Sequence, residues 1–111
     1  MTPDPDALRR LRERTAAEVA TLEADLHSLF EASRSSNADD EHDPEGATIG
    51  FERAQLTAIL AATRRHLADL DLALRRSADG TYGVCEVCGQ AIPVERMEAR
   101  PSARTCVGCA G

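Results

Sequence analysis

Four cysteines, all within the last 27 residues, constrain this chain more than any other feature. They form two Cys-x2-Cys pairs, Cys85/Cys88 and Cys106/Cys109, separated by seventeen residues. A Cys-x2-Cys turn holds two thiolates at the separation of two corners of a tetrahedron, and two such turns close a site with Zn–S distances of ~2.3 Å. Gly89 permits the tight turn that points backbone amides at the sulfurs. Because four protein ligands leave no open position, we predict one structural Zn²⁺.

Two other assignments of the cysteines remain open, namely an iron site of the rubredoxin type and a disulfide or thiol switch. Iron sites with this pairing usually have a rich aromatic surround, and only Tyr82 is available here. Residues 1–20 are polar and charged, and the longest apolar run is Ala58–Ala62, so we expect no signal peptide, no membrane span and a cytoplasmic location. In a reducing compartment, paired cysteines indicate a metal site more readily than disulfides.

The remainder of the chain predicts two long helices. Only 3% of the 111 residues are aromatic, so the chain has few large side chains with which to build a core. We expect helices over about 5–34 and 49–77, the second ending at Asp79-Gly80, and similar lengths favour an antiparallel hairpin. The apolar stripes that predict them are Leu8, Leu11, Thr15, Val19, Leu22, Leu26 and Leu29/Phe30, then Ile49, Leu56, Leu60, Thr63, Leu67, Leu70 and Leu74.

The expected fold is therefore mainly α: a long antiparallel two-helix coiled-coil hairpin over 1–79 and a small four-cysteine zinc finger over 80–111. The base of the hairpin should rest on the finger, since two helices with one seam bury little surface. The tip loop, at about 35–48, has five acids and no base. With a pI near 5.0, the chain is a poor candidate for binding nucleic acid through its phosphate groups. The tip acids are Asp39, Asp40, Glu41, Asp43 and Glu45.

The finger resembles that of the DksA/TraR family, since the residues that match in identity and spacing are Cys85, Glu86, Cys88, Ile92, Arg96, Pro101, Cys106 and Cys109, after the approach Gly80-Thr81-Tyr82-Gly83. The resemblance implies a transcription regulator that binds RNA polymerase directly. Family members insert the hairpin into the secondary channel and place acidic tip residues near the catalytic magnesium, often together with the nucleotide ppGpp. An acidic tip suits a cation-lined channel.

The sequence also departs from the family pattern. The family tip reads Asp-Pro-x-Asp-x-Ala, whereas this chain has Asp43 and Pro44 but Gly46 in place of the second aspartate. Asp40 and Asp43 restore the same spacing one turn earlier, so the tip chemistry is either shifted or absent. The sequence ends two residues after Cys109, without the C-terminal helix that family members use for nucleotide contacts, which argues against dependence on ppGpp.

Other functions stay open beside this one. The chain could be a zinc-stapled coiled-coil adaptor with an inert tip, or a nucleic-acid-binding finger that uses Arg96, Arg100 and Arg104. His42 lies among the tip acids, but a surface histidine is the simpler interpretation, as for His27 and His66. No nucleophile elbow, phosphate loop or carboxylate pair is evident, so we expect no enzyme.

Overall fold

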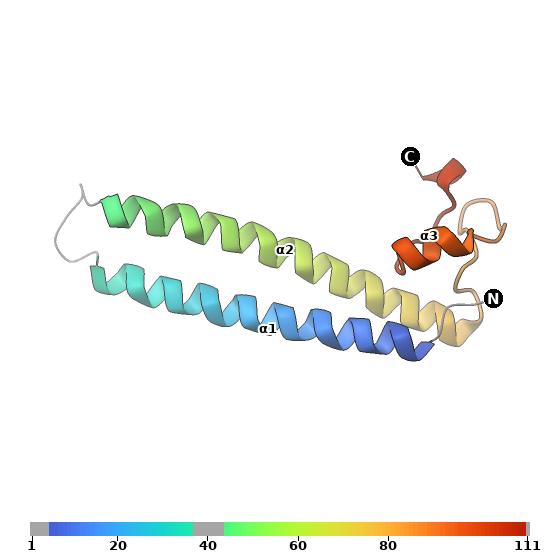
Figure 1. Ribbon diagram of the computed structural model, residues 1–111, viewed down its shortest axis with the longest axis horizontal. Coiled ribbons are helices and arrows are strands. Elements are labelled where there is room, and N and C mark those ends of the chain that lie inside the picture. The colour runs from blue at the N-terminus through green and yellow to red at the C-terminus, as the bar shows by residue number, and fades with distance from the viewer. Residues whose placement is uncertain (1–4, 37–43, 111) are drawn as a thin grey trace. The chain divides into compact units, whose positions relative to one another are not determined.

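The computed structural model describes residues 5–36 and 44–110. Its elements are α1 (Pro5–Ser36), α2 (Pro44–Asp79), the short α3 (Val94–Ala99) and a 3-10 turn at Val107–Cys109, as Figure 1 shows. Extended pairing in the described ranges is limited to one antiparallel bridge between Val84 and Ala91. The predicted mainly helical fold is confirmed.

The helix ends differ from the predicted ones. The second helix begins at Pro44 rather than near residue 49, so Pro44–Thr48 are helical and not part of a loop. Proline is favoured in the first turn of a helix because its φ is already helical and its missing N–H would have no partner there. At the other end, α2 runs to Asp79, and Gly80 has a φ of +80°, the left-handed conformation expected of a closing glycine. The first helix ends at Ser36, two residues beyond its predicted end.

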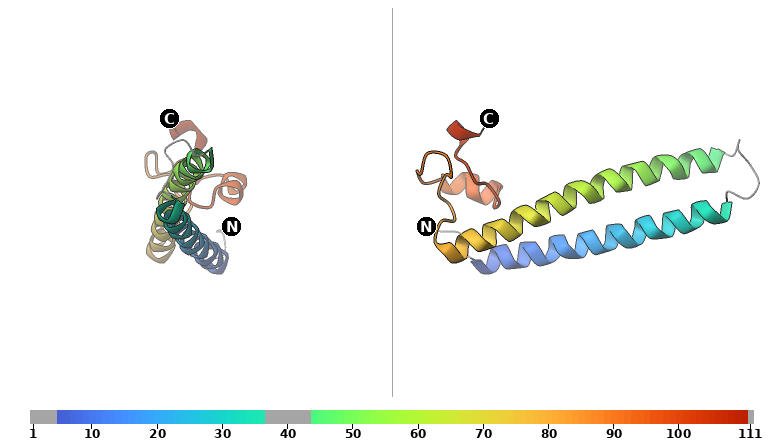
Figure 2. Two further views of the ribbon diagram at one scale, coloured as in Figure 1. Left: turned by 90° about the vertical axis from the view of Figure 1, so that its left-hand side faces the viewer. Right: turned by 180° about the vertical axis from the view of Figure 1, so that it is seen from behind.

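The chain divides into two compact units, residues 16–65 and residues 1–15 with 66–111. Within residues 16–65, α1 and α2 lie side by side in both views of Figure 2. Arg64 Nη2 bonds Glu23 Oε2 at 2.7 Å, and the guanidinium carbon of Arg53 lies 4.4 Å from the ring centroid of Phe30. As the position rises along α1, its partner on α2 falls, so the two helices are antiparallel.

Most positions of the predicted stripes in this unit are shielded from solvent, with Val19 and Leu60 buried. Phe30 is the exception, since 46% of it is exposed. Leu29 is half-buried in its place, and the Phe30 ring carries the Arg53 guanidinium on its face.

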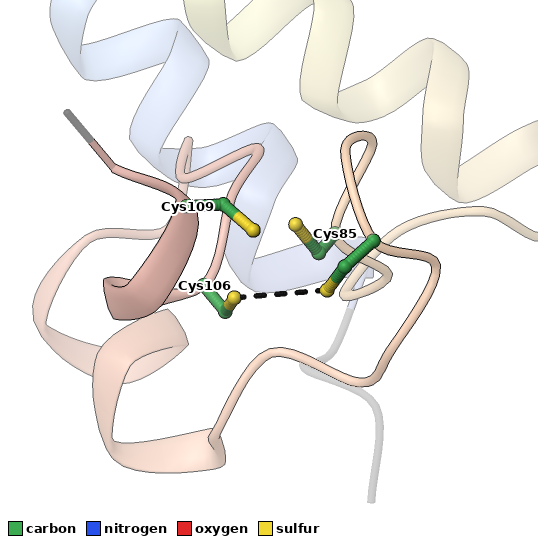
Figure 3. Close-up of side chains that lie close together, drawn as sticks. Cys85, Cys106 and Cys109 are labelled. Carbon is green, nitrogen blue, oxygen red and sulfur yellow. Dashed lines mark hydrogen bonds between the residues drawn. The ribbon is translucent and has the colours of Figure 1, made fainter.

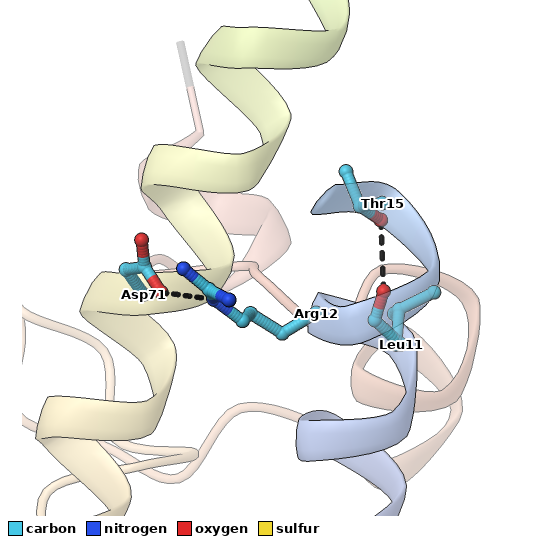
Figure 4. A network of polar contacts seen from close by, with 4 residues as sticks. All are labelled: Leu11, Arg12, Thr15 and Asp71. Atoms are coloured by element: carbon cyan, nitrogen blue, oxygen red, sulfur yellow. Dashed lines mark hydrogen bonds and ion pairs between the residues drawn. The ribbon is translucent and has the colours of Figure 1, made fainter. Parts of the chain in front are cut away.

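The other unit holds the main core, in which the first turns of α1 and the last turns of α2 pack with the finger. As expected, the base of the helix pair therefore rests on residues 80–110. Arg12 Nε donates to Asp71 Oδ1 at 2.8 Å, and the hydroxyl of buried Thr15 donates to the Leu11 carbonyl (Figure 4). The buried cluster consists of Leu8, Leu70, Ala73, Tyr82, Cys85, Ile92 and Met97.

Leu70 offers a test of this core because none of it is exposed to solvent. We expect Leu70→Ala to lower the free energy of unfolding of the zinc-loaded protein by about 2–5 kcal/mol, since it removes buried methyl groups and leaves a cavity. The matched control is Ile59→Ala, on the same helix at a residue that is 50% exposed, with an expected change within about 0.5 kcal/mol. Denaturant titration followed by circular dichroism measures both, and equal losses would contradict this core.

Candidate metal centre

The first Cys-x2-Cys pair lies on a tight turn after α2. The bridge between Val84 and Ala91 pairs the two sides of this turn, and the Cys85 amide donates to the Gln90 carbonyl at 2.8 Å. The Gly89 amide donates to the Cys85 carbonyl at 2.9 Å, and Gly89 has a φ of +75°. This positive φ supports the prediction that a glycine is needed here to close the turn.

The second pair lies on a turn of the same kind at the end of the described chain. The Ala110 amide donates to the Cys106 carbonyl at 3.0 Å, which repeats the bond from Gly89 to Cys85 four residues back. The Glu86 amide donates to the Arg104 carbonyl at 2.9 Å and so joins the first turn to the segment that leads into the second. One backbone hydrogen bond thus joins the first turn to the segment that leads into a second, similar turn.

The four cysteine sulfurs form one cluster, with all Sγ atoms within 4.8 Å of one another. The thiols of Cys85, Cys106 and Cys109 point toward a common centre in Figure 3. Cys88 Sγ and Cys106 Sγ are 3.8 Å apart. Sulfurs at the corners of a tetrahedron, each about 2.3 Å from a central zinc ion, lie about 3.8 Å from one another. The donor set and its spacing therefore fit Zn²⁺.

A disulfide does not fit this arrangement. A bonded pair of sulfurs is about 2.0 Å apart, whereas all four cysteines here are free thiols. The cluster suits one structural zinc ion held by four thiolates, with no position left for water or a substrate. Zinc supplies binding free energy that stabilises this end of the chain rather than chemistry on a substrate.

The metal-free thiols hold their protons unevenly. Amides of Cys88, Cys106 and Val87 donate hydrogen bonds to the Cys85 sulfur and lower the pKa of Cys85 to about 6. Hydrogen bonds with the thiols of Cys106 and Cys85 raise the pKa of Cys109 to about 12. The amide of Gln90 favours the Cys88 thiolate, but the neighbouring Cys85 thiol and desolvation outweigh it, and the pKa of Cys88 is raised. The pKa of Cys85 is thus lower than those of Cys88 and Cys109, and a divalent cation bound by these thiols would replace their protons.

Burial also differs around the cluster. Cys85 is 1% exposed and belongs to the core with Leu8 and Leu70, whereas Cys88 is exposed. The metal site is therefore continuous with the hydrophobic core on one side and open to solvent on the other.

The finger-motif residues have separate structural tasks. Ile92 is buried in the core, and Pro101 offers its carbonyl to the Tyr82 hydroxyl at 2.7 Å. Arg96 Nε donates to the Thr105 carbonyl at 2.8 Å. The other finger arginines are more exposed: Arg104 lies 3.9 Å from a Glu86 carboxylate oxygen, and Arg100 is on the surface.

Sequence reasoning missed three residues that position the site. The Arg76 guanidinium, in the last turn of α2, donates to the carbonyls of Thr81 and Val84 and so fixes the entry to the first turn. Tyr82 is buried, which raises the pKa of its hydroxyl, and Met97, the buried residue of α3, is 2% exposed. The approach Gly80-Thr81-Tyr82-Gly83 was the available signal for Tyr82, but nothing in the sequence marked Arg76.

Of the predicted tip residues, the structure describes only one. Asp39, Asp40, Glu41, Asp43 and His42 lie outside the described residues, while Glu45 falls in the first turn of α2. His27 and His66 are exposed on helix surfaces, as expected. None of the described helices combines the length and the apolar character that crossing a bilayer requires.

Comparisons with known proteins agree with this geometry. Residues 80–111 match the family model described as the prokaryotic dksA/traR C4-type zinc finger. The chain is 44% identical over 69 residues to the uncharacterized protein YteA of Bacillus subtilis, a match that covers 62% of this chain and 29% of that protein. It is 50% identical over 40 residues to the RNA polymerase-binding transcription factor DksA of Caulobacter vibrioides, covering 36% of this chain and 28% of that protein. The chain thus matches less than a third of the length of either relative.

A solved structure extends the similarity beyond the finger. The transcription factor DksA2 from Pseudomonas aeruginosa superimposes with a TM-score of 0.77 and 29% sequence identity, covering 94% of this chain and 74% of that one. The similarity in fold therefore includes the helix pair.

The cluster predicts how zinc binding responds to substitution. The protein should hold one zinc ion per chain, and Cys106→Ser should weaken zinc binding by more than the roughly 100-fold that marks the upper range for outer-shell changes, because it removes a ligand. The control is Val87→Ser, which changes a residue that is 69% exposed between two cysteines and should leave the affinity unchanged. Elemental analysis and chelator competition measure both, and full zinc retention by Cys106→Ser would contradict a four-cysteine site.

Proposed function

We propose that this chain, whose residues 80–111 match the DksA/TraR zinc finger family, is a transcription regulator that binds RNA polymerase directly. The similarity to DksA2 over 94% of the chain, with the cysteine cluster formed, carries this proposal. DksA of Caulobacter vibrioides, which shares the finger, is named as an RNA polymerase-binding transcription factor. The proposal assigns the chain a cytoplasmic location and no catalysis.

The finer proposal concerns the tip. Five acids without a base lie between residues 35 and 48, four of them in the connection between α1 and α2 and Glu45 in the first turn of α2. In residues 16–65 the antiparallel helices are tied by the pair Arg64–Glu23 and by Arg53 on Phe30, which supports a stiff hairpin. A stiff helix pair ending in concentrated negative charge suits the polymerase secondary channel, where cations near the active site attract it. Asp39, Asp40, Glu41, Asp43 and Glu45 are the proposed tip contacts.

Direct binding of nucleic acid has less support from the finger arginines. Arg96 is occupied with the Thr105 carbonyl, and Arg104 lies near Glu86. The chain as a whole carries a net charge of -6, which opposes contact with a phosphate backbone.

One observation favours a second candidate, an adaptor that binds protein partners without acting through the tip. Gly46 stands where the family has its second tip aspartate, so a carboxylate used by the family is missing from its place. The two candidates differ in whether the remaining tip acids matter.

Retention of RNA polymerase tests the first step. Immobilised zinc-loaded protein should capture purified core RNA polymerase, and the capture should weaken as salt rises if charge steers association. A protein with the exposed acids Glu18 and Asp25 neutralised, Glu18→Gln/Asp25→Asn, should capture it equally well. If no polymerase is retained at any salt concentration, the proposed function fails.

A single-round initiation assay tests the tip. Asp40→Asn/Asp43→Asn should lower the effect on initiation by on the order of tenfold, because focused charge raises association rates by at least that factor. Glu18→Gln/Asp25→Asn makes the same change in net charge on the exposed side of α1 and should act as wild type. If the tip variant retains polymerase and acts as wild type, the adaptor is favoured. The same assay with and without ppGpp tests the expectation that the nucleotide is not required.

A further inference from the structure

The middle of α2 presents an uncharged face to solvent. Between Arg53 and Arg64 no residue of the helix carries a charge. Two large apolar side chains are nevertheless exposed in this part of the helix, since Phe51 is 68% exposed and Ile59 is 50% exposed. Single exposed apolar residues are ordinary on a protein surface, whereas a group of them on one face indicates a surface that binds another molecule.

The residues of this face are arranged symmetrically about Ala58. Steps of three or four residues keep helical side chains on one face, and such steps lead away from Ala58 in both directions. Toward the N-terminus they reach Ala54 and then Phe51, and toward the C-terminus they reach Ala62 and then Arg65. All five side chains are exposed. The two halves of the face therefore match, except that one ends in an aromatic ring and the other in a cation.

This ring and this cation are not used within the described part of the chain. Arg53 lies over Phe30, with its guanidinium carbon 4.4 Å from the ring centroid. Among the described residues, by contrast, Arg65 makes no ion pair and no ring contact, and no cation lies over Phe51. The two residues are about 21 Å apart along the helix, so they cannot meet each other. A guanidinium over an aromatic ring is a favourable contact, and both of its parts are free to form it with another molecule.

We propose that this face of α2 binds the same face of a second copy of the chain, with the two helices antiparallel about a two-fold axis at Ala58. In a two-fold contact, residue i of one copy meets residue j of the other, and j meets i. Antiparallel pairing about Ala58 places Phe51 opposite Arg65 of the partner subunit, and this contact occurs twice. Ala54 faces Ala62 of the partner subunit, and side chains this small let two helices approach closely.

The dimer is expected to be weak. From Phe51 to Arg65 the face is about 21 Å long, and one helix face of this length buries less than the roughly 800 Å² per partner of a stable complex. Each copy also carries a net charge of -6, which repels the other copy. We therefore expect monomers in dilute solution and dimers as the concentration rises, most readily at an ionic strength that screens this repulsion.

Sedimentation equilibrium of the zinc-loaded full chain measures the association. The mass should rise from the 11.9 kDa of one chain toward twice that value as the concentration approaches about 1 mM. Ala58→Glu brings two like charges together at the axis and should remove the association. Ala20→Glu makes the same change at an exposed alanine of α1 and should dimerise as wild type. A wild-type chain that stays monomeric at every concentration would overturn the proposal, and this is the result expected if the face binds a different protein.

Arg65→Gln tests the contact between ring and cation. Because two symmetry-related contacts are lost, the dissociation constant should rise by about 5–30-fold, as expected for two exposed cation–π contacts. Arg10→Gln makes the same change in charge at an exposed arginine of α1 and should leave the dissociation constant unchanged. Equal dissociation constants for the two variants would contradict the pairing of Phe51 with Arg65 of the partner subunit.

A mixing experiment tests the position of the axis. Ala58→Glu and Ala58→Arg should each be monomeric alone, because like charges meet at the axis. Mixed in equal amounts, the two variants should associate, since the new carboxylate of one faces the new guanidinium of the other. Circular dichroism of each variant alone checks that it folds. If the mixture associates no more than either variant alone, the two-fold arrangement is wrong. None of these measurements involves polymerase, so the outcome is independent of the proposed function.

Discussion

The cluster of four thiols is the contact on which the C-terminal part of the chain depends. Residues 80–110 contain one short helix, one 3-10 turn and a single bridge, so little regular structure holds them in place. Cys88 and Cys106 are eighteen positions apart in sequence, yet their sulfurs lie 3.8 Å apart. A metal that closes such a loop removes much of the conformational freedom of the unfolded chain. Because Cys85 is also a core residue beside Leu8 and Leu70, the same closure completes the packing around the helix ends.

Features set by local geometry could be predicted from the sequence. The helical stripes depend only on a period along the chain, and the cysteine turns depend on the spacing within each pair and on a following glycine. These local patterns are sufficient to predict the fold class and the metal cluster. The start of α2 differs from the prediction because the acidic, proline-containing stretch has the composition of a loop, although Pro44 is well suited to the first turn of a helix.

Residues that act through backbone carbonyls could not be predicted in the same way. Arg76, Tyr82 and Arg96 each donate to a carbonyl whose position exists only once the chain has folded. Every residue has a backbone carbonyl, so the residue type at the acceptor position does not reveal which carbonyl accepts the hydrogen bond. The family resemblance singled out Arg96, but its contact with Thr105 became visible only in the structure. Phe30 is a related case. It belongs to an apolar stripe in the sequence, but the stripe does not predict that its ring packs against the guanidinium of Arg53.

Some charged residues of the chain stabilise its fold, and others are proposed to contact a partner. Arg76, in the last turn of α2, and Arg96, in α3, donate to backbone carbonyls, and Arg104 lies near a carboxylate, so these cations serve the loops that carry the cysteines. The acids between residues 35 and 48 have no base within that stretch of sequence. Mutual repulsion makes such a concentration costly for an isolated chain, and a cationic partner is the simplest source of compensation. Three arginines near the cysteines thus contact the chain itself, while five acids gather in one stretch, and this distribution agrees with the proposed cationic protein partner better than with nucleic acid.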